Sequence, residues 1–250
     1  ILVAGVIFGG IKRIGLVAGR IVPIMVLIYL LGGLGILIKN YDKLGSIFNL
    51  IITDAFTGNA VVGGIVGEVI RQGIRRAVFS NEAGLGTEVM AHGAAKTKEP
   101  VREGLVAMIG PFIDTILVCS ITAFAILVSG VWNDPTLNGV SMTAKAFSNE
   151  LGFLGEFILF FSVFTFSVTT MFGQSYYGAK CTGFLFGSRW KVNYNWFYVL
   201  STIFGATVSI SIVINLIDGM YAIMAIPTMV STILLAPKVM KETRRYFSAI

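Results

Sequence analysis

The residues best suited to binding chemistry are concentrated in one short stretch, residues 79–87, which reads FSNEAGLGT. Each glycine weakens a helix by about 1 kcal/mol relative to alanine, and serine and asparagine side chains compete with the backbone for hydrogen bonds. We therefore expect a helix that is broken near residues 79–86. Carbonyl oxygens released at such a break would ligate a cation, and the amides of residues 84–87, at the start of the second half-helix, would face a carboxylate. This combination suits a zwitterion that travels with a metal ion.

The same stretch has a simpler interpretation, a kink at which the glycines let another helix approach. Glu82 favours the functional interpretation, because an ionisable side chain deep in a bilayer costs about 2.5 kcal/mol or more and indicates a function or a partner. Non-helical backbone in a membrane is tolerated only where it is buried in protein or lines a polar cavity. The spacing alone leaves both interpretations open.

A second group of candidate ligands is a run of hydroxyl side chains, namely Ser162, Thr165, Ser167, Thr169 and Thr170. Thr169 and Thr170 follow Phe166 by three and four residues, so both hydroxyls would meet the Phe166 carbonyl if the helix is locally loosened. Oxygen ligands suit a hard monovalent cation. The alternative is structural, because serine and threonine in membrane helices commonly bond back to their own helix or across to a neighbour. Gln174 lies one turn beyond Thr170 on the same face and would border the same cavity.

The roles of two other polar residues are not decided by the sequence. Asp114 lies in an apolar segment and would pair with an arginine, contact the broken segment or bond a neighbouring helix. His92 is the only histidine and stands near Lys96, which is typical of a boundary residue. The sequence contains no nucleophile with a supporting base, no phosphate-binding glycine loop and no paired Cys/His ligands, so we expect neither an enzyme nor a cofactor.

The elements that position these residues are membrane helices. The chain is 55% hydrophobic and 13% charged, with a mean hydropathy of +0.83, whereas soluble domains contain about a quarter charged residues. Each crossing needs about 20 mostly apolar residues. We expect an all-α polytopic membrane protein with spans at residues 21–38, 105–131, 151–178, 196–217 and 220–237. Residues 61–92 form a further irregular crossing, residues 41–56 form a short amphipathic helix, and Asp218-Gly219 joins the last two spans in a tight hairpin.

The basic residues indicate orientation in the membrane. The net charge of +6 comes from lysines and arginines that lie between the apolar segments, which favours a membrane protein held by the positive-inside rule and excludes nucleic acid as a partner. If successive loops lie on alternate sides of the membrane, residues 238–245 lie on the cytoplasmic side. We therefore predict a multi-pass protein of the cell (plasma or inner) membrane with a cytoplasmic C-terminus.

The beginning of the chain resembles the middle of a protein. Residues 1–9 are apolar, too short to span, and preceded by neither a methionine nor a charged signal region. We interpret residues 1–250 as a single transmembrane transporter domain whose N-terminal part is missing.

Several motifs resemble the alanine or glycine:cation symporter family, the sodium/alanine symporters. They are RAVFSNEAGLG at residues 76–86, AHGAAKTKEPVREGL at 91–105, FIDT at 112–115, FGGIKR at 8–13 and SYYG at 175–178. Together they extend across nearly the whole chain, and the long middle stretch is highly specific. The resemblance covers the C-terminal part of such a transporter.

The resemblance implies a five-helix inverted-repeat core in which two broken helices meet at the membrane midplane. It implies sodium-coupled symport of a small neutral amino acid, alanine or glycine, by alternating access, with sodium as the coupling ion and the lipid bilayer as the surrounding partner. The implied substrate-binding residues are Phe79, Ser80, Asn81, Gly84, Thr170 and Gln174. The implied sodium ligands are Phe166, Thr169 and Thr170.

Two features qualify this resemblance. Many family members have tryptophan where Gln174 stands, which bears on substrate size. The first broken helix would lie among the missing N-terminal helices, so residues 1–250 alone are not expected to transport. An ion channel, or an intramembrane enzyme that uses Asp114 or Glu82, remains as an alternative function.

Overall fold

The computed structural model describes residues 2–57, 65–82 and 84–248, and within these residues all regular structure is helical. Four helical segments are long and apolar enough to cross a membrane: Gly10–Lys39, Pro100–Ser129, Phe153–Phe186 and Ile210–Ser248. The expected spans at 21–38, 105–131 and 151–178 are therefore confirmed. An all-α polytopic membrane protein is the fold class that results.

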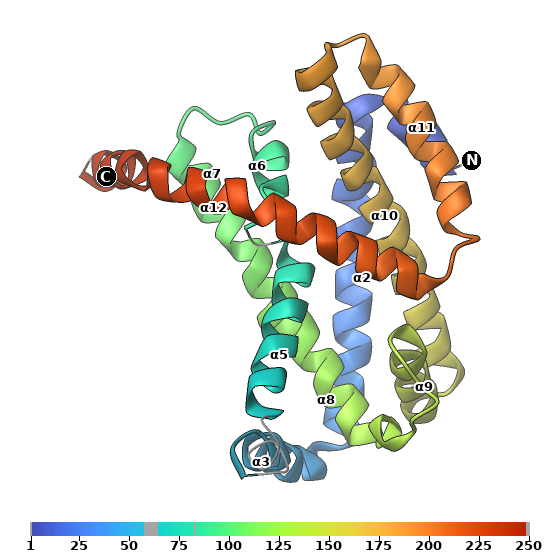
Figure 1. Ribbon diagram of the computed structural model, residues 1–250. Helices are drawn as coiled ribbons and strands as arrows, with labels where there is room; N and C mark the ends of the chain where they lie inside the picture. Colours follow the sequence, from blue (N-terminus) through green and yellow to red (C-terminus); the bar gives the residue numbers. More distant parts are fainter. Residues whose placement is uncertain (1, 58–64, 83, 249–250) are drawn as a thin grey trace. The chain divides into compact units, whose positions relative to one another are not determined.

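Figure 1 shows the order of the described helices along the chain. In chain order they are α1 (Leu2–Ile7), α2 (Gly10–Lys39), α3 (Tyr41–Thr57), α5 (Ile65–Asn81), α6 (Thr87–His92), α7 (Pro100–Pro111), the π-helical η1 (Phe112–Cys119), α8 (Ser120–Ser129), the 3-10 turn η2 (Val131–Asn133), α9 (Val140–Leu151), α10 (Phe153–Phe186), α11 (Trp190–Gly205) and α12 (Ile210–Ser248). The amphipathic helix expected at 41–56 is α3. The chain divides into two compact units, of residues 1–14, 78–111 and 171–250, and of residues 15–77 and 112–170.

The span expected at 220–237 lies within the membrane-length helix Ile210–Ser248, but the boundary between the last two spans differs from the prediction. Asp218-Gly219 lies inside the continuous helix α12, so the expected tight hairpin there is wrong. The turn occurs earlier, between α11 and α12. There the Thr207 hydroxyl donates to the Phe204 carbonyl at 2.7 Å, and the Ser209 carbonyl accepts hydrogen bonds from the amides of Ile212 and Val213. A glycine in an apolar helix costs only about 1 kcal/mol, which the neighbouring apolar residues outweigh. The segment 196–217 is accordingly split between two helices.

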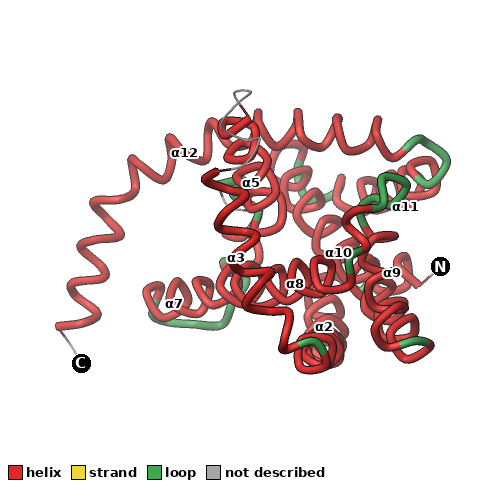
Figure 2. The backbone as a smooth tube through the Cα atoms, turned by 90° about the horizontal axis from the view of Figure 1, so that it is seen from below, coloured by secondary structure: helices red, strands yellow, loops and turns green. Residues whose placement is uncertain are grey.

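α12 and α11 complete the unit that contains the broken segment. α12 bends along its length, as Figure 2 shows, and it contains Pro227 and Pro237, each of which removes a backbone hydrogen bond. α11 runs antiparallel to the end of α10: Tyr198 donates to the Met171 carbonyl at 3.1 Å, whereas Tyr194, earlier in α11, lies against Gly178, later in α10. The second half of α10 is thereby supported along its length.

The second unit has its core where α2, α8, α9 and α10 meet. Ile36, Ala125 and Phe147 are fully buried there, and Ile158 and Leu159 pack against them. At the edge of this core Asn40 is buried and donates from Nδ2 to the Glu150 carboxylate at 2.8 Å and to the Ile36 carbonyl at 3.1 Å. These bonds join the end of α2 to α9.

Asn40→Ala should therefore lower the free energy of unfolding by about 1–3 kcal/mol, because it leaves the Glu150 carboxylate and the helix end without a buried donor. The measurement is the melting temperature of the purified protein in detergent. Lys39→Ala is the matched control: the Lys39 side chain is 56% exposed in its ion pair with Glu150, and such pairs contribute about 0–1 kcal/mol. An equal loss in both variants would contradict this account.

Candidate functional site

The expected break is present and lies between α5 and α6. α5 ends at Asn81 and α6 begins at Thr87. Glu82, Gly84 and Gly86 all have positive φ angles, of 51°, 79° and 81°. A left-handed residue stops a helix because it turns the next amides away from the helical hydrogen-bond pattern. The prediction of a broken helix is confirmed by these angles.

The boundary of the break differs from the prediction by three residues. Phe79, Ser80 and Asn81 form the last turn of α5 rather than part of the unwound stretch. Serine and asparagine are tolerated in a terminal helical turn, and the left-handed Glu82 is what ends the helix. α6 has only six residues. So few aligned peptide units give a weak macrodipole, and the N-terminus of α6 does not by itself make a carboxylate site.

The Glu82 carboxylate accepts hydrogen bonds from two side chains. One carboxylate oxygen accepts a hydrogen bond from the Thr87 hydroxyl, and the other accepts from Gln174 Nε2 at 2.7 Å. Thr87 is only 3% exposed, so its bond closes the break from the α6 side. Gln174 comes from α10, so its bond ties the break to a second helix. The carboxylate that the sequence marked as needing a partner therefore has two.

The other side of the break contacts α12. Gly86 lies so close to Thr228 that a β-carbon built at Gly86 would be 3.0 Å from the Thr228 hydroxyl oxygen. The ring of Phe79 lies 5.7 Å from the ring of Tyr221, centroid to centroid. Leu85, within the break, is buried at 3% exposure. Leu85, Gly86 and Thr87 are thus packed in protein, whereas Gly84 is exposed and a β-carbon there would meet nothing within 4 Å.

The structure brings part of the predicted substrate set together. Phe79, Ser80 and Asn81 follow one another in the last turn of α5, Gly84 lies in the break, and Gln174 is bonded to the break through Glu82. Thr170 lies one helical turn before Gln174 in α10. Gln174 is the distant member of this set, because the residue that it contacts, Glu82, lies 92 positions earlier in the chain.

The predicted sodium ligands lie in the middle of α10. The Thr169 hydroxyl donates to the Thr165 carbonyl at 2.9 Å and to the Phe166 carbonyl at 3.1 Å. α10 is continuous from Phe153 to Phe186, so the local loosening that would let both threonines share the Phe166 carbonyl is not seen. In this structure Thr169 has the back-bonded arrangement that the sequence left as its alternative. The ligand set remains a prediction.

His92 and Asp114 have different surroundings. His92 Nδ1 lies 2.7 Å from the Glu103 carboxylate and so links α6 to α7. Asp114 lies in the π-helical segment Phe112–Cys119, a conformation that is frequent at functional sites. Within the residues that the structure describes, no group of three or more His, Cys, Asp or Glu side chains is arranged to hold a metal ion.

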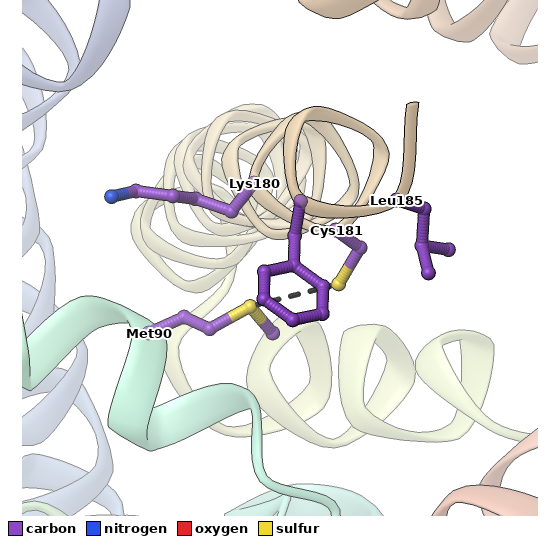
Figure 3. Close-up of a pocket in the computed structure, with 5 residues that line it drawn as sticks. Met90, Lys180, Cys181 and Leu185 are labelled. Carbon is purple, nitrogen blue, oxygen red and sulfur yellow. Dashed lines mark hydrogen bonds between the residues drawn. The ribbon is translucent and has the colours of Figure 1, made fainter. Parts of the chain in front are cut away.

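An apolar pocket lies beside this site, between α6 and the end of α10 (Figure 3). Met90, Lys180, Cys181, Phe184 and Leu185 line it, and the sulfur atoms of Met90 and Cys181 are 3.8 Å apart. The Lys180 ammonium points away from the sulfur pair in Figure 3. A pocket without convergent polar groups has no means of orienting a zwitterion. It is distinct from the predicted substrate site.

The sequence profile described as "Sodium:alanine symporter family" matches residues 1–250. This chain belongs to the sodium:alanine symporter family. It is 41% identical over 249 residues to the sodium/alanine symporter AgcS of Methanococcus maripaludis, covering 98% of this chain and 55% of that protein. It is 37% identical over 255 residues to an uncharacterized transporter of Haemophilus influenzae, covering 100% and 56%.

A third relative carries another substrate in its name. The probable sodium/glutamine symporter GlnT of Bacillus subtilis is 32% identical over 242 residues, covering 96% of this chain and 51% of that protein. The chain thus spans about half the length of the curated relatives that it matches. As a member of the sodium:alanine symporter family it belongs with transporters, not enzymes, which confirms the expectation drawn from the absence of a catalytic motif.

Sequence reasoning missed two residues of the site. Thr87 was included in the stretch at residues 79–87, but nothing in the spacing paired it with Glu82. Thr228 was not considered, although a hydroxyl within an apolar span is a recognised sign of a helix contact. Its neighbour, Gly86, lies 142 positions away in the chain, and no local pattern connects them.

Proposed function

We propose that this chain is part of a sodium-coupled symporter that moves a small neutral amino acid, alanine or glycine, by alternating access. The observation that carries the proposal is the break between α5 and α6, in a chain that belongs to the sodium:alanine symporter family. Broken helices in such transporters present unpaired backbone groups to substrate and ion. The substrate site comprises Phe79, Ser80, Asn81, Gly84, Thr170 and Gln174.

The coupling ion is sodium, held by the Phe166 carbonyl and the hydroxyls of Thr169 and Thr170. All three ligands are oxygen atoms, which suits a hard cation. In the proposed cycle sodium shares the Phe166 carbonyl oxygen, which now accepts a hydrogen bond from the Thr169 hydroxyl. The remaining ligands for substrate and ion come from a first broken helix in the preceding part of the transporter, within a five-helix inverted-repeat core. The basic end of α12 lies on the cytoplasmic side.

The test is uptake of labelled L-alanine by the full-length transporter in liposomes. A symporter should show saturable uptake driven by an inward sodium gradient and reduced to the level of empty liposomes when potassium replaces sodium. Removing a hydroxyl ligand from a cation costs about 1.5–3 kcal/mol, so Thr170→Val should raise the sodium concentration for half-maximal uptake about tenfold or more. Labelled glycine and glutamine, offered as competitors, define the substrate.

Ser162→Ala is the matched control on the same helix. The Ser162 hydroxyl is buried and donates to the Ile158 carbonyl at 2.7 Å, outside the proposed ligand set. Its loss should leave the sodium dependence unchanged. Ion current without alanine would indicate a channel and reject the symport mechanism, as would alanine uptake that does not depend on sodium.

A further inference from the structure

Glu82 occupies a position that the proposed binding site does not by itself explain. Its backbone is left-handed at a residue other than glycine, which costs about 1–2 kcal/mol. It carries a carboxylate, and none of the ion pairs found among the described residues includes it. A side chain that adds both backbone strain and a charge to a membrane site has to be offset by specific interactions.

The two interactions of Glu82 are both made by neutral donors. The Thr87 hydroxyl binds one oxygen, and Gln174 Nε2 binds the other at 2.7 Å. An ionised carboxylate only accepts hydrogen bonds, so Gln174 must turn its NH₂ group towards Glu82 and its carbonyl oxygen away from it. The charge of Glu82 therefore sets the direction of an amide on another helix.

The titratable groups near Glu82 in the described part of the chain provide no positive charge that would replace its two hydrogen bonds. Tyr177 of α10 and Tyr221 of α12 are close enough to interact electrostatically with the Glu82 carboxylate. Glu88 of α6 interacts in the same way with Tyr177. A phenol is neutral at physiological pH, so neither tyrosine supplies a counter-charge. Hydrogen bonding from Thr87 and Gln174 is what holds the carboxylate.

We propose that Glu82 is a positioning residue of the transporter: its carboxylate joins the first residue of α6 to Gln174 of α10 and directs the Gln174 carbonyl to the substrate. The inference rests on the proposed function, since it places the substrate at this break. Glu82 itself does not contact the substrate. It acts through Gln174, whose fixed carbonyl accepts a hydrogen bond from the bound amino acid.

The test exchanges the two side chains. Gln174→Glu alone places two carboxylates at hydrogen-bond distance, so the KM for alanine at neutral pH should rise about tenfold or more, because like charges in contact cost several kcal/mol. At acidic pH the pair shares one proton, and the KM should recover. Adding Glu82→Gln should restore the bridge at neutral pH, since an amide at position 82 donates to the carboxylate at 174 and accepts from Thr87.

The double variant should therefore bind alanine within about threefold of the wild-type KM, with a flat pH profile. Failure of Glu82→Gln to rescue Gln174→Glu, or a wild-type KM in Gln174→Glu alone, overturns the proposal. Maximal rates are normalised to the amount of folded transporter. Variants that change only this amount and leave the KM unchanged would indicate a purely structural role for Glu82 and would also contradict the proposal. If Gln174→Glu does not accumulate, the KM of the double variant decides: a value within about threefold of the wild type supports the proposal, and a higher value rejects it.

A truncation series keeps the two proposals separate. Glu82→Ala and Gln174→Ala break the same bridge, so the double variant should raise the KM no more than the worse single variant, whereas additive losses contradict the coupling. Wild-type uptake is measured in the same preparations. Sodium-dependent uptake with additive losses rejects only the role of Glu82, and absence of that uptake rejects the symport function on which the role rests.

Discussion

Replacing Gly86 with valine is expected to abolish transport and to lower the melting temperature of the protein. Gly86 has a φ of 81°, a left-handed conformation that costs a residue with a β-carbon about 1–2 kcal/mol, and a β-branched residue more. The new β-carbon would also lie 3.0 Å from the Thr228 hydroxyl oxygen. Overpacking of this kind costs about 1–3 kcal/mol. The backbone strain and the overpacking together should outweigh the contacts that hold the break, so α6 should no longer pack against α12.

The two causes can be separated with smaller changes. Gly84→Ala meets only the backbone strain, because φ there is 79° and a β-carbon would have no heavy atom of another residue within 4 Å. Gly86→Ala meets both strain and contact, and Thr228→Ala in that background should recover part of the loss. Because Gly84 belongs to the proposed substrate site, the melting temperature in detergent is the measurement for this comparison. Equal effects at Gly84 and Gly86 would show that the contact with Thr228 contributes nothing.

The second large effect is expected for Asn81→Ala, which should reduce alanine uptake about 100-fold, because a hydrogen bond to a charged group contributes about 1.5–3 kcal/mol and each 1.4 kcal/mol is a factor of ten. Asn81 is the last residue of α5, directly before the left-handed Glu82. Its amide supplies both a donor and an acceptor at the point where the backbone leaves the helix. The alanine variant removes both.

The measurement is initial uptake of labelled L-alanine under a sodium gradient, normalised to the amount of folded transporter. Asn49→Ala provides the control, because Asn49 is an exposed amide of α3 and lies outside the proposed site. Its uptake should equal that of the wild type. Wild-type uptake in Asn81→Ala would remove the centre of the proposed substrate site.

The apolar runs were sufficient to predict most of the membrane helices. The spans at 21–38, 105–131 and 151–178 were found because a run of about 20 apolar residues has few stable alternatives to a helix in a bilayer. The prediction was wrong at Asp218-Gly219, which is a turn signal in soluble proteins. In α12 the dipeptide stands between long apolar stretches, and the continuous helix satisfies its backbone hydrogen bonds.

The break between α5 and α6 was predicted for the right reason, but its N-terminal boundary was placed three residues too early. Glycines and polar residues are known to weaken a helix, and they do so here. Which residue ends the helix depends on a single left-handed φ angle at Glu82, a non-glycine position to which no propensity scale would assign it. The boundary therefore became visible only in the structure.

The amino-acid sequence by itself determined the all-helical membrane fold, the place of the break and the family, because hydropathy, helix propensity and a contiguous motif are local properties of the chain. Only the tertiary structure decided what surrounds the break. The bond between Glu82 and Gln174 and the contact between Gly86 and Thr228 join residues far apart in the chain. Such contacts depend on how whole helices pack, and side-chain spacing along one helix carries no information about its neighbour's register.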